Sequence, residues 1–231
     1  MLSATVLDTN ISIANIDHVV DKIISWAGLR SSRTVCLVNT HMLCEALDNK
    51  SLANALSYSD INCADGMPIV RVLNTLGYSD KKRVAGVDLF HAVCQRLNDN
   101  DSDLSLLLLG SDDETLAKMK SKLIRQYSDL TIAGTISLPF SRELTELEDL
   151  TLIEAINNSR ASVTAICLGC PKQEIFAFKH LGKIDSVMIG LGAVFAQYAN
   201  DAPRAPKLVR ELSLEWLWRL CLEPARLWPR Y

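Results

Sequence analysis

The sequence lacks a hydrophobic run long enough to cross a bilayer, since none approaches the roughly 18–20 residues that a spanning helix needs. Its first ten residues show no basic stretch followed by an apolar one, so we expect no secretory signal. It also lacks a basic surplus, because its net charge of −3 argues against a general nucleic-acid binder. With 231 residues, 48% of them hydrophobic, the chain can form one large α/β domain with a substantial core.

Three familiar catalytic patterns are missing as well: the phosphate-binding P-loop, the Gly-x-Ser-x-Gly nucleophile turn and the His-Glu-x-x-His zinc motif. The seven cysteines are an odd number, and we expect them to be reduced, buried thiols. Cys167 and Cys170 have the spacing of a metal or redox pair, but a structural zinc site needs a second pair. The sequence therefore predicts no metal site and leaves a redox dithiol as the minor alternative.

What is present is an alternation of buried strands and amphipathic helices. We predict strands at 34–38, 61–64, 104–109, 130–136, 163–168 and 186–189, and helices at 41–57, 67–76, 87–97, 113–127, 142–158 and 172–180. Strands separated by helices imply right-handed crossovers, hence an α/β fold whose mostly parallel sheet has helices on both faces. Residues 4–13 are expected to form a hairpin or an edge addition.

The last 28 residues, 204–231, differ from the rest of the chain. They hold six basic and three acidic residues, a net charge of +3, so residues 1–203 carry −6. Three of the four tryptophans lie here. Leu212, Trp216 and Leu220 recur at a four-residue step, which predicts an amphipathic helix before Pro224.

We therefore divide the chain into a core, 1–203, and a C-terminal appendage, 204–231. Arginines beside tryptophans suit an anionic membrane surface, where the rings lie at headgroup depth and the cations meet anionic lipid. The alternative is a helix docked on its own domain with tryptophan in the core. This stretch alone favours neither interpretation.

Ligands of a parallel sheet bind beyond the carboxyl ends of its strands, and five predicted strand ends carry polar residues or glycine. These are Asn39-Thr40, Asp65-Gly66, Gly110-Ser111-Asp112, Gly169 to Glu174, and Gly190-Leu191-Gly192. The helix after Gly110 begins with carboxylates that would repel a phosphate, whereas Lys172 follows Gly169 at a better anion site. The Gly190-x-Gly192 pair matches only the start of a dinucleotide fingerprint. Asp65 either faces the site or caps the next helix.

Several short motifs, in order along nearly the whole chain, together resemble the WecG/TagA/CpsF family of bacterial glycosyltransferases. They are Asn39 at a strand end, Ala64-Asp65-Gly66, Arg83 to Asp88, Leu168-Gly169 with Pro171 to Glu174, Gly190-Leu191-Gly192, Arg204-Ala205-Pro206, Leu214-Glu215-Trp216, Arg219-Leu220, and Glu223-Pro224 with Arg226. One departure is Leu37, which stands where the family often has threonine.

The resemblance implies a Rossmann-like core and an inverting transfer of a sugar from a UDP-sugar to a polyprenyl-diphosphate-linked sugar. The donors it implies are UDP-N-acetylmannosamine, its uronate or UDP-glucose, in the assembly of cell-surface polysaccharide. It further implies action without metal or other cofactor, at the inner face of the cytoplasmic membrane. The sequence leaves a homo-oligomer open.

With this chemistry, Asp65 is the expected general base, because inversion needs one group to deprotonate the acceptor hydroxyl. Asn39 and Gln173 are expected to orient sugar hydroxyls. Cations are expected to stabilise the leaving diphosphate, and the candidates are Arg83, Arg204, Arg219 and Arg226. Further binding candidates are Thr40, Gly66, Gly110, Gly169, Lys172 and Gly190.

Simpler interpretations remain for two of these cations. Arg83 could be an ordinary surface residue, and Arg219 could pair with Glu215 or Glu223 at helical spacing. Two other functions also stay open at this point. One is a peripheral membrane adaptor without activity, and the other is a dinucleotide-dependent oxidoreductase on the same fold.

Overall fold

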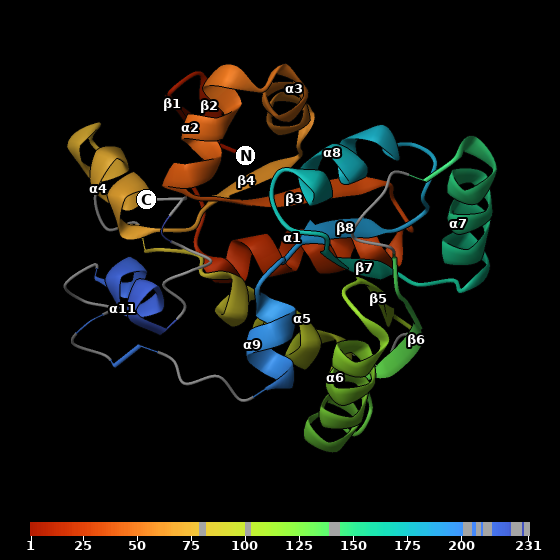
Figure 1. Ribbon diagram of the computed structural model, residues 1–231. Coiled ribbons are helices and arrows are strands. Elements are labelled where there is room, and N and C mark those ends of the chain that lie inside the picture. Colours follow the sequence, from red (N-terminus) through yellow and green to blue (C-terminus); the bar gives the residue numbers. More distant parts are fainter. Residues whose placement is uncertain are drawn as a thin grey trace.

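The computed structural model describes residues 1–78, 82–99, 103–138, 144–200, 205–206, 209, 214–222 and 228, with the backbone alone at 215, 216, 219 and 222. Its main feature is a six-stranded sheet in the order β4-β3-β8-β7-β5-β6, in which every neighbouring pair is parallel (Figure 1). The strands are β3 (Arg33–Val38), β4 (Ile61–Ala64), β5 (Ser105–Gly110), β6 (Thr131–Ile136), β7 (Val163–Cys167) and β8 (Val187–Gly190). The predicted α/β class with a parallel, Rossmann-like sheet is confirmed.

A separate hairpin of two antiparallel strands, β1 (Ser3–Val6) and β2 (Thr9–Ser12), lies at the start of the chain. It joins the main body through Asn62 of β4, whose backbone N–H donates to the Ser12 hydroxyl and whose side chain donates to the Asn10 carbonyl. The hairpin expected for residues 4–13 is therefore present, outside the main sheet.

Helices cover both faces of the sheet, as Figure 1 shows. Alternate residues of β3 point to opposite faces, so Val35 and Leu37 enter one core cluster while Cys36 and Val38 enter another. The first face is covered by α1 (Ile16–Gly28), α5 (Gly86–Asn98), α6 (Asp113–Gln126) and α9 (Val194–Ala199). The second is covered by α2 (Thr40–Asp48), α3 (Lys50–Tyr58), α4 (Met67–Thr75), α7 (Glu146–Asn158) and α8 (Lys172–Lys179).

Most predicted helices match the structure to within one residue at each end, and two differ by more. The helix expected over 41–57 is two helices, because Asn49 ends α2 and its side chain accepts from the Leu52 N–H to start α3. The helix expected from residue 142 starts at Glu146, after Thr145, which forms a capping box with Glu148. Helices α1 and α9 lie outside the predicted ranges.

The appendage contributes helix α11 (Glu215–Leu222), as the amphipathic pattern before Pro224 predicts. Leu214 and Leu217 are partly exposed, whereas Ala205 is buried. Leu212 lies outside the described residues. Among the residues that the structure describes, no helix is both long and apolar enough to cross a membrane.

The close approach of two strand ends requires a glycine at position 110. A Cβ at this position would lie 2.3 Å from the Cys167 carbonyl oxygen, and the backbone φ is +90°. We therefore predict that Gly110→Ala destabilises the fold by at least the roughly 1–3 kcal/mol of an unfavourable backbone conformation. Urea denaturation measures this, with Gly28→Ala as the control, because nothing lies within 4 Å of a Cβ built there. Equal stability of the two variants would contradict the interpretation.

Candidate active site

Three neighbouring strands, β4, β3 and β8, bring the central predicted residues to one edge of the sheet. Asp65 follows β4 and Asn39 follows β3, and the Asp65 N–H donates to the Val38 carbonyl at 2.8 Å. Gln173 comes from α8, and its side chain lies against Gly190 at the end of β8. Two strand spacings, roughly 10 Å, separate β4 from β8. A sugar nucleotide could span residues from all three strands.

Asp65 is partly exposed and forms an ion pair. Its Oδ1 lies 3.8 Å from Arg83 Nε, and the two side chains are 29% and 18% exposed. The segment that carries Arg83 is held to β4 because the Val84 N–H donates to the Ala64 carbonyl. The N-cap of α4 is Gly66, at φ +134°, so Asp65 lies one residue before the cap position. Arg83 is therefore the neighbour of the candidate base, and its side chain is mostly shielded from solvent.

Asn39 starts helix α2. Its side-chain Oδ1 accepts from the Met42 N–H at 3.0 Å, which fixes the side chain and leaves its amide nitrogen to donate elsewhere. Thr40 is the first residue of α2 and is exposed. Asn39 and Thr40 thus lie beside the Asp65 strand end through the pairing of β3 with β4.

Gln173 is 5% exposed and occupies the space that two glycines leave open. A Cβ on Gly190 would lie 3.0 Å from Gln173 Nε2, and one on Gly192 would lie 3.2 Å from Gln173 Oε1. The Gly190-x-Gly192 pair therefore makes room for a side chain of the protein itself. A dinucleotide fingerprint uses its glycines for close approach to a pyrophosphate, so this geometry weighs against the oxidoreductase interpretation.

Glu174, the next residue, was not among the predicted site residues. It is 1% exposed, and its Oε1 accepts from Gln173 Nε2 at 2.8 Å. Burial raises the pKa of this carboxyl group to about 7, and the hydrogen bonds from Gln173 and the Cys170 thiol oppose that rise.

A family model for glycosyl transferases of the WecG/TagA/CpsF family matches residues 4–231. The chain belongs to this family of glycosyltransferases. The match covers nearly the whole chain, so the sheet edge with Asp65 and the appendage both lie within the part that the family shares. Membership supports a sugar donor and a sugar acceptor as substrates.

Not every predicted binding residue of this WecG/TagA/CpsF family member lies beside Asp65. Gly110 is the last residue of β5, four strand spacings or roughly 19 Å from β4. Gly169 follows β7, and Lys172 begins α8 with an exposed side chain. The Gln173 N–H in that first turn donates to the Gly169 carbonyl, so it is not available to an anion.

The arginines predicted in the appendage fall outside what the structure describes. Arg204 and Arg226 are not among the described residues, and of Arg219 only the backbone in α11 is described. The expected roles of these WecG/TagA/CpsF family arginines stay predictions. Over the described ranges, no three His, Cys, Asp or Glu side chains form a group that could hold a metal ion.

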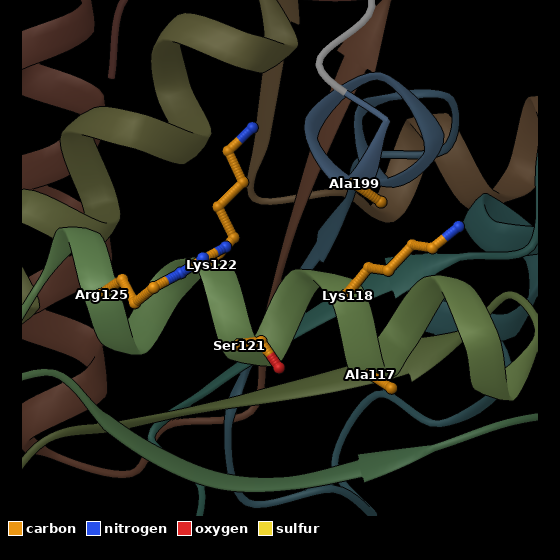
Figure 2. Close-up of a pocket in the computed structure, with 6 residues that line it drawn as sticks. All are labelled: Ala117, Lys118, Ser121, Lys122, Arg125 and Ala199. Carbon is orange, nitrogen blue, oxygen red and sulfur yellow. The ribbon is translucent and has the colours of Figure 1, made fainter.

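A basic pocket of about 310 Å³ lies elsewhere on this glycosyltransferase, between α6 and α9 (Figure 2). It is lined by Ala117, Lys118, Ser121, Lys122, Arg125 and Ala199. Lys122 donates to the Tyr198 carbonyl at 2.8 Å, and Lys118 pairs with Glu114 at 2.7 Å. Both lysines therefore already contact other residues of the chain, and the pocket is not assigned to the substrate site.

The raised pKa of Glu174 predicts a pH dependence of stability. Between pH 4.5 and about 7 the folded chain binds more protons at this group than the unfolded chain, so the free energy of unfolding falls as pH rises. This contribution amounts to about 3 kcal/mol across that range. Glu174→Gln should remove it, and urea denaturation of both proteins from pH 5 to 8 measures the difference. If the free energy of unfolding had the same pH dependence in both proteins, the raised pKa of Glu174 would be contradicted.

Proposed function

We propose that the chain is an inverting glycosyltransferase that moves a sugar from a UDP-sugar to a polyprenyl-diphosphate-linked sugar. The observation that carries this proposal is the position of Asp65, paired with Arg83 at the edge shared by β4, β3 and β8, in a member of a glycosyltransferase family. The donor is UDP-N-acetylmannosamine, its uronate or UDP-glucose. The product enters the assembly of cell-surface polysaccharide.

In the proposed step, the Asp65 carboxylate takes the proton of the acceptor hydroxyl as that oxygen attacks the anomeric carbon of the donor. The new bond joins the anomeric carbon to the acceptor oxygen. The bond to the β-phosphate oxygen breaks, and that oxygen leaves on UDP with the electron pair. Attack from the face opposite the leaving group inverts the anomeric centre. One carboxylate suffices, because only one proton has to be removed.

The leaving diphosphate gains negative charge, which nearby cations stabilise more in the transition state than in the bound substrate. Arg83 is the described cation beside the base. Arg219 and Arg226 of the appendage are proposed to add to it, with Arg204. Asn39, through its amide nitrogen, and Gln173 are proposed to hold sugar hydroxyls. No metal ion or cofactor is part of this proposal.

The lipid acceptor places the reaction at the inner face of the cytoplasmic membrane in this proposal. The appendage carries a net charge of +3 and three tryptophans, a composition that suits an anionic lipid surface. Trp228 is 74% exposed. We propose that residues 204–231 hold the site at the bilayer, where a polyprenyl diphosphate can reach Asp65.

A screen for UDP release tests the function. The full chain is incubated with UDP-glucose, UDP-N-acetylmannosamine and its uronate, each with and without a short-chain lipid diphosphate that carries a sugar. We expect acceptor-dependent release of UDP from one donor, with a glycosylated lipid as the second product. Vesicle binding without UDP release from any donor would instead favour the membrane adaptor.

A further inference from the structure

Gln173 and Glu174 form a buried polar pair in the first turn of α8. They are 5% and 1% exposed, and Gln173 Nε2 donates to Glu174 Oε1 at 2.8 Å. Each side chain also keeps one buried oxygen, Gln173 Oε1 and Glu174 Oε2, without a hydrogen-bond partner in the described part of the chain. Buried polar atoms are almost always paired, so these two acceptors without a partner require an explanation.

The surroundings fix where the Gln173 side chain lies. Gly190 and Gly192 leave it room at the end of β8, with Oε1 the atom that a Cβ on Gly192 would approach most closely. Its amide could still rotate by half a turn, because oxygen and nitrogen have nearly the same shape. The ionised carboxylate of Glu174 can accept but not donate, so it pairs with the amide nitrogen of Gln173 and not with the amide oxygen. A protonated carboxyl group could also donate, and could therefore pair with either atom.

We propose that Glu174 is a positioning residue for sugar transfer. Its carboxylate holds the Gln173 amide with Nε2 inward, so that Oε1 is the edge offered to a hydroxyl of the donor sugar, directly or through one water. This inference rests on the proposed function and deepens it. The bound donor then supplies the hydrogen bond that Gln173 Oε1 lacks.

In the described part of the chain, the ionisable side chains that interact with Glu174 are two thiols, and the pKa of Glu174 itself is about 7. Cys36 of β3 faces it, and burial raises the pKa of that thiol to about 12. Cys170 hydrogen-bonds it from the preceding loop. The residues of β8 are not ionisable, and α3 brings Tyr58, which stacks on Phe178 of α8. Protonation of Glu174 removes the negative charge that holds Gln173 Nε2 toward the Glu174 carboxylate.

The kinetic test compares Glu174→Gln with the wild type and with Glu154→Gln, an exposed control on α7. At pH 8 we expect Glu174→Gln to lower kcat/KM about tenfold, the effect of one misdirected hydrogen bond, mainly through KM for the donor. The wild type should lose kcat/KM between pH 8 and 6 with an ionisation that Glu174→Gln lacks, and Glu174→Asp should restore part of it. An unchanged kcat/KM and pH profile in folded Glu174→Gln would overturn the proposal.

A double-mutant cycle tests whether Glu174 acts through its neighbour. In a Gln173→Ala background, Glu174→Gln should have little further effect on kcat/KM, because there is no amide left to orient. The same tenfold loss in that background would contradict a positioning role.

A measurement without turnover covers the case in which Glu174→Gln does not fold or no donor is found. The side-chain amide signals of Gln173, assigned by their absence in Gln173→Ala, should shift in the wild-type NMR spectrum between pH 6 and 8. No shift would overturn the coupling of the two side chains. The failure of UDP release from all donors, with the shift present, would instead count against the proposed function.

Discussion

Asp65→Asn should lower sugar transfer about 10²–10⁴-fold, the usual effect of losing a general base. Asparagine has nearly the shape of aspartate but cannot take the proton of the acceptor hydroxyl. UDP binding should persist, because the proposed nucleotide contacts come from other residues. The ion pair with Arg83 is long, at 3.8 Å, and partly exposed, so its loss should leave the fold intact.

The rate of transfer and the affinity for UDP are measured separately, by product formation and by calorimetric titration. The matched control is Asp185→Asn, an exposed aspartate that precedes β8 at the opposite edge of the sheet. It should transfer sugar like the wild type. Near-wild-type turnover in Asp65→Asn would remove Asp65 from the role of base and leave the family assignment in place.

Deleting the residues after Pro206 should abolish transfer while the sheet stays folded. All six strands end by Gly190, and the buried Ala205 is kept in the shortened chain. What is lost is α11 with the proposed diphosphate cations Arg219 and Arg226 and the tryptophans assigned to the lipid surface. The expected loss is at least about 10²-fold, the effect of removing one strong transition-state contact.

Circular dichroism and urea denaturation of the truncated chain check the fold, and product formation checks transfer. A single substitution, Trp228→Ala in the full chain, tests the same segment. It should weaken binding to anionic vesicles without changing the free energy of unfolding. Full turnover by the truncated chain would refute a role of the appendage in catalysis. If the truncated chain unfolded, the deleted tryptophans would instead belong to the core of the domain.

The strands could be predicted because a strand buried on both faces leaves a clear signal. Leu106 to Leu109 are apolar without interruption, and all four are buried in β5. Residues 16–28 also carry a readable pattern, with Val19, Val20, Ile23 and Ala27 all buried on one side of α1, although it lies outside our predicted ranges. Helix breaks are harder, because Asn49 ends one helix and caps the next through a single side-chain hydrogen bond.

Only the general location of the candidate site could be predicted from the sequence. A carboxylate next to a glycine at a strand end pointed to Asp65, but strand order decides that Asn39 is its neighbour and Gly110 is not. Two glycines at the end of β8 suggested a ligand, and their space is filled by Gln173 instead. The burial of Glu174 depends on the packing of α8 against the sheet, which no local pattern encodes.

The most direct test of the account is a crystal structure of the full chain with UDP. We expect the nucleotide at the carboxyl ends of β4, β3 and β8, with its diphosphate toward Arg83 and within reach of Gln173. A nucleotide bound in the basic pocket between α6 and α9, with the Asp65 edge empty, would contradict the central claim.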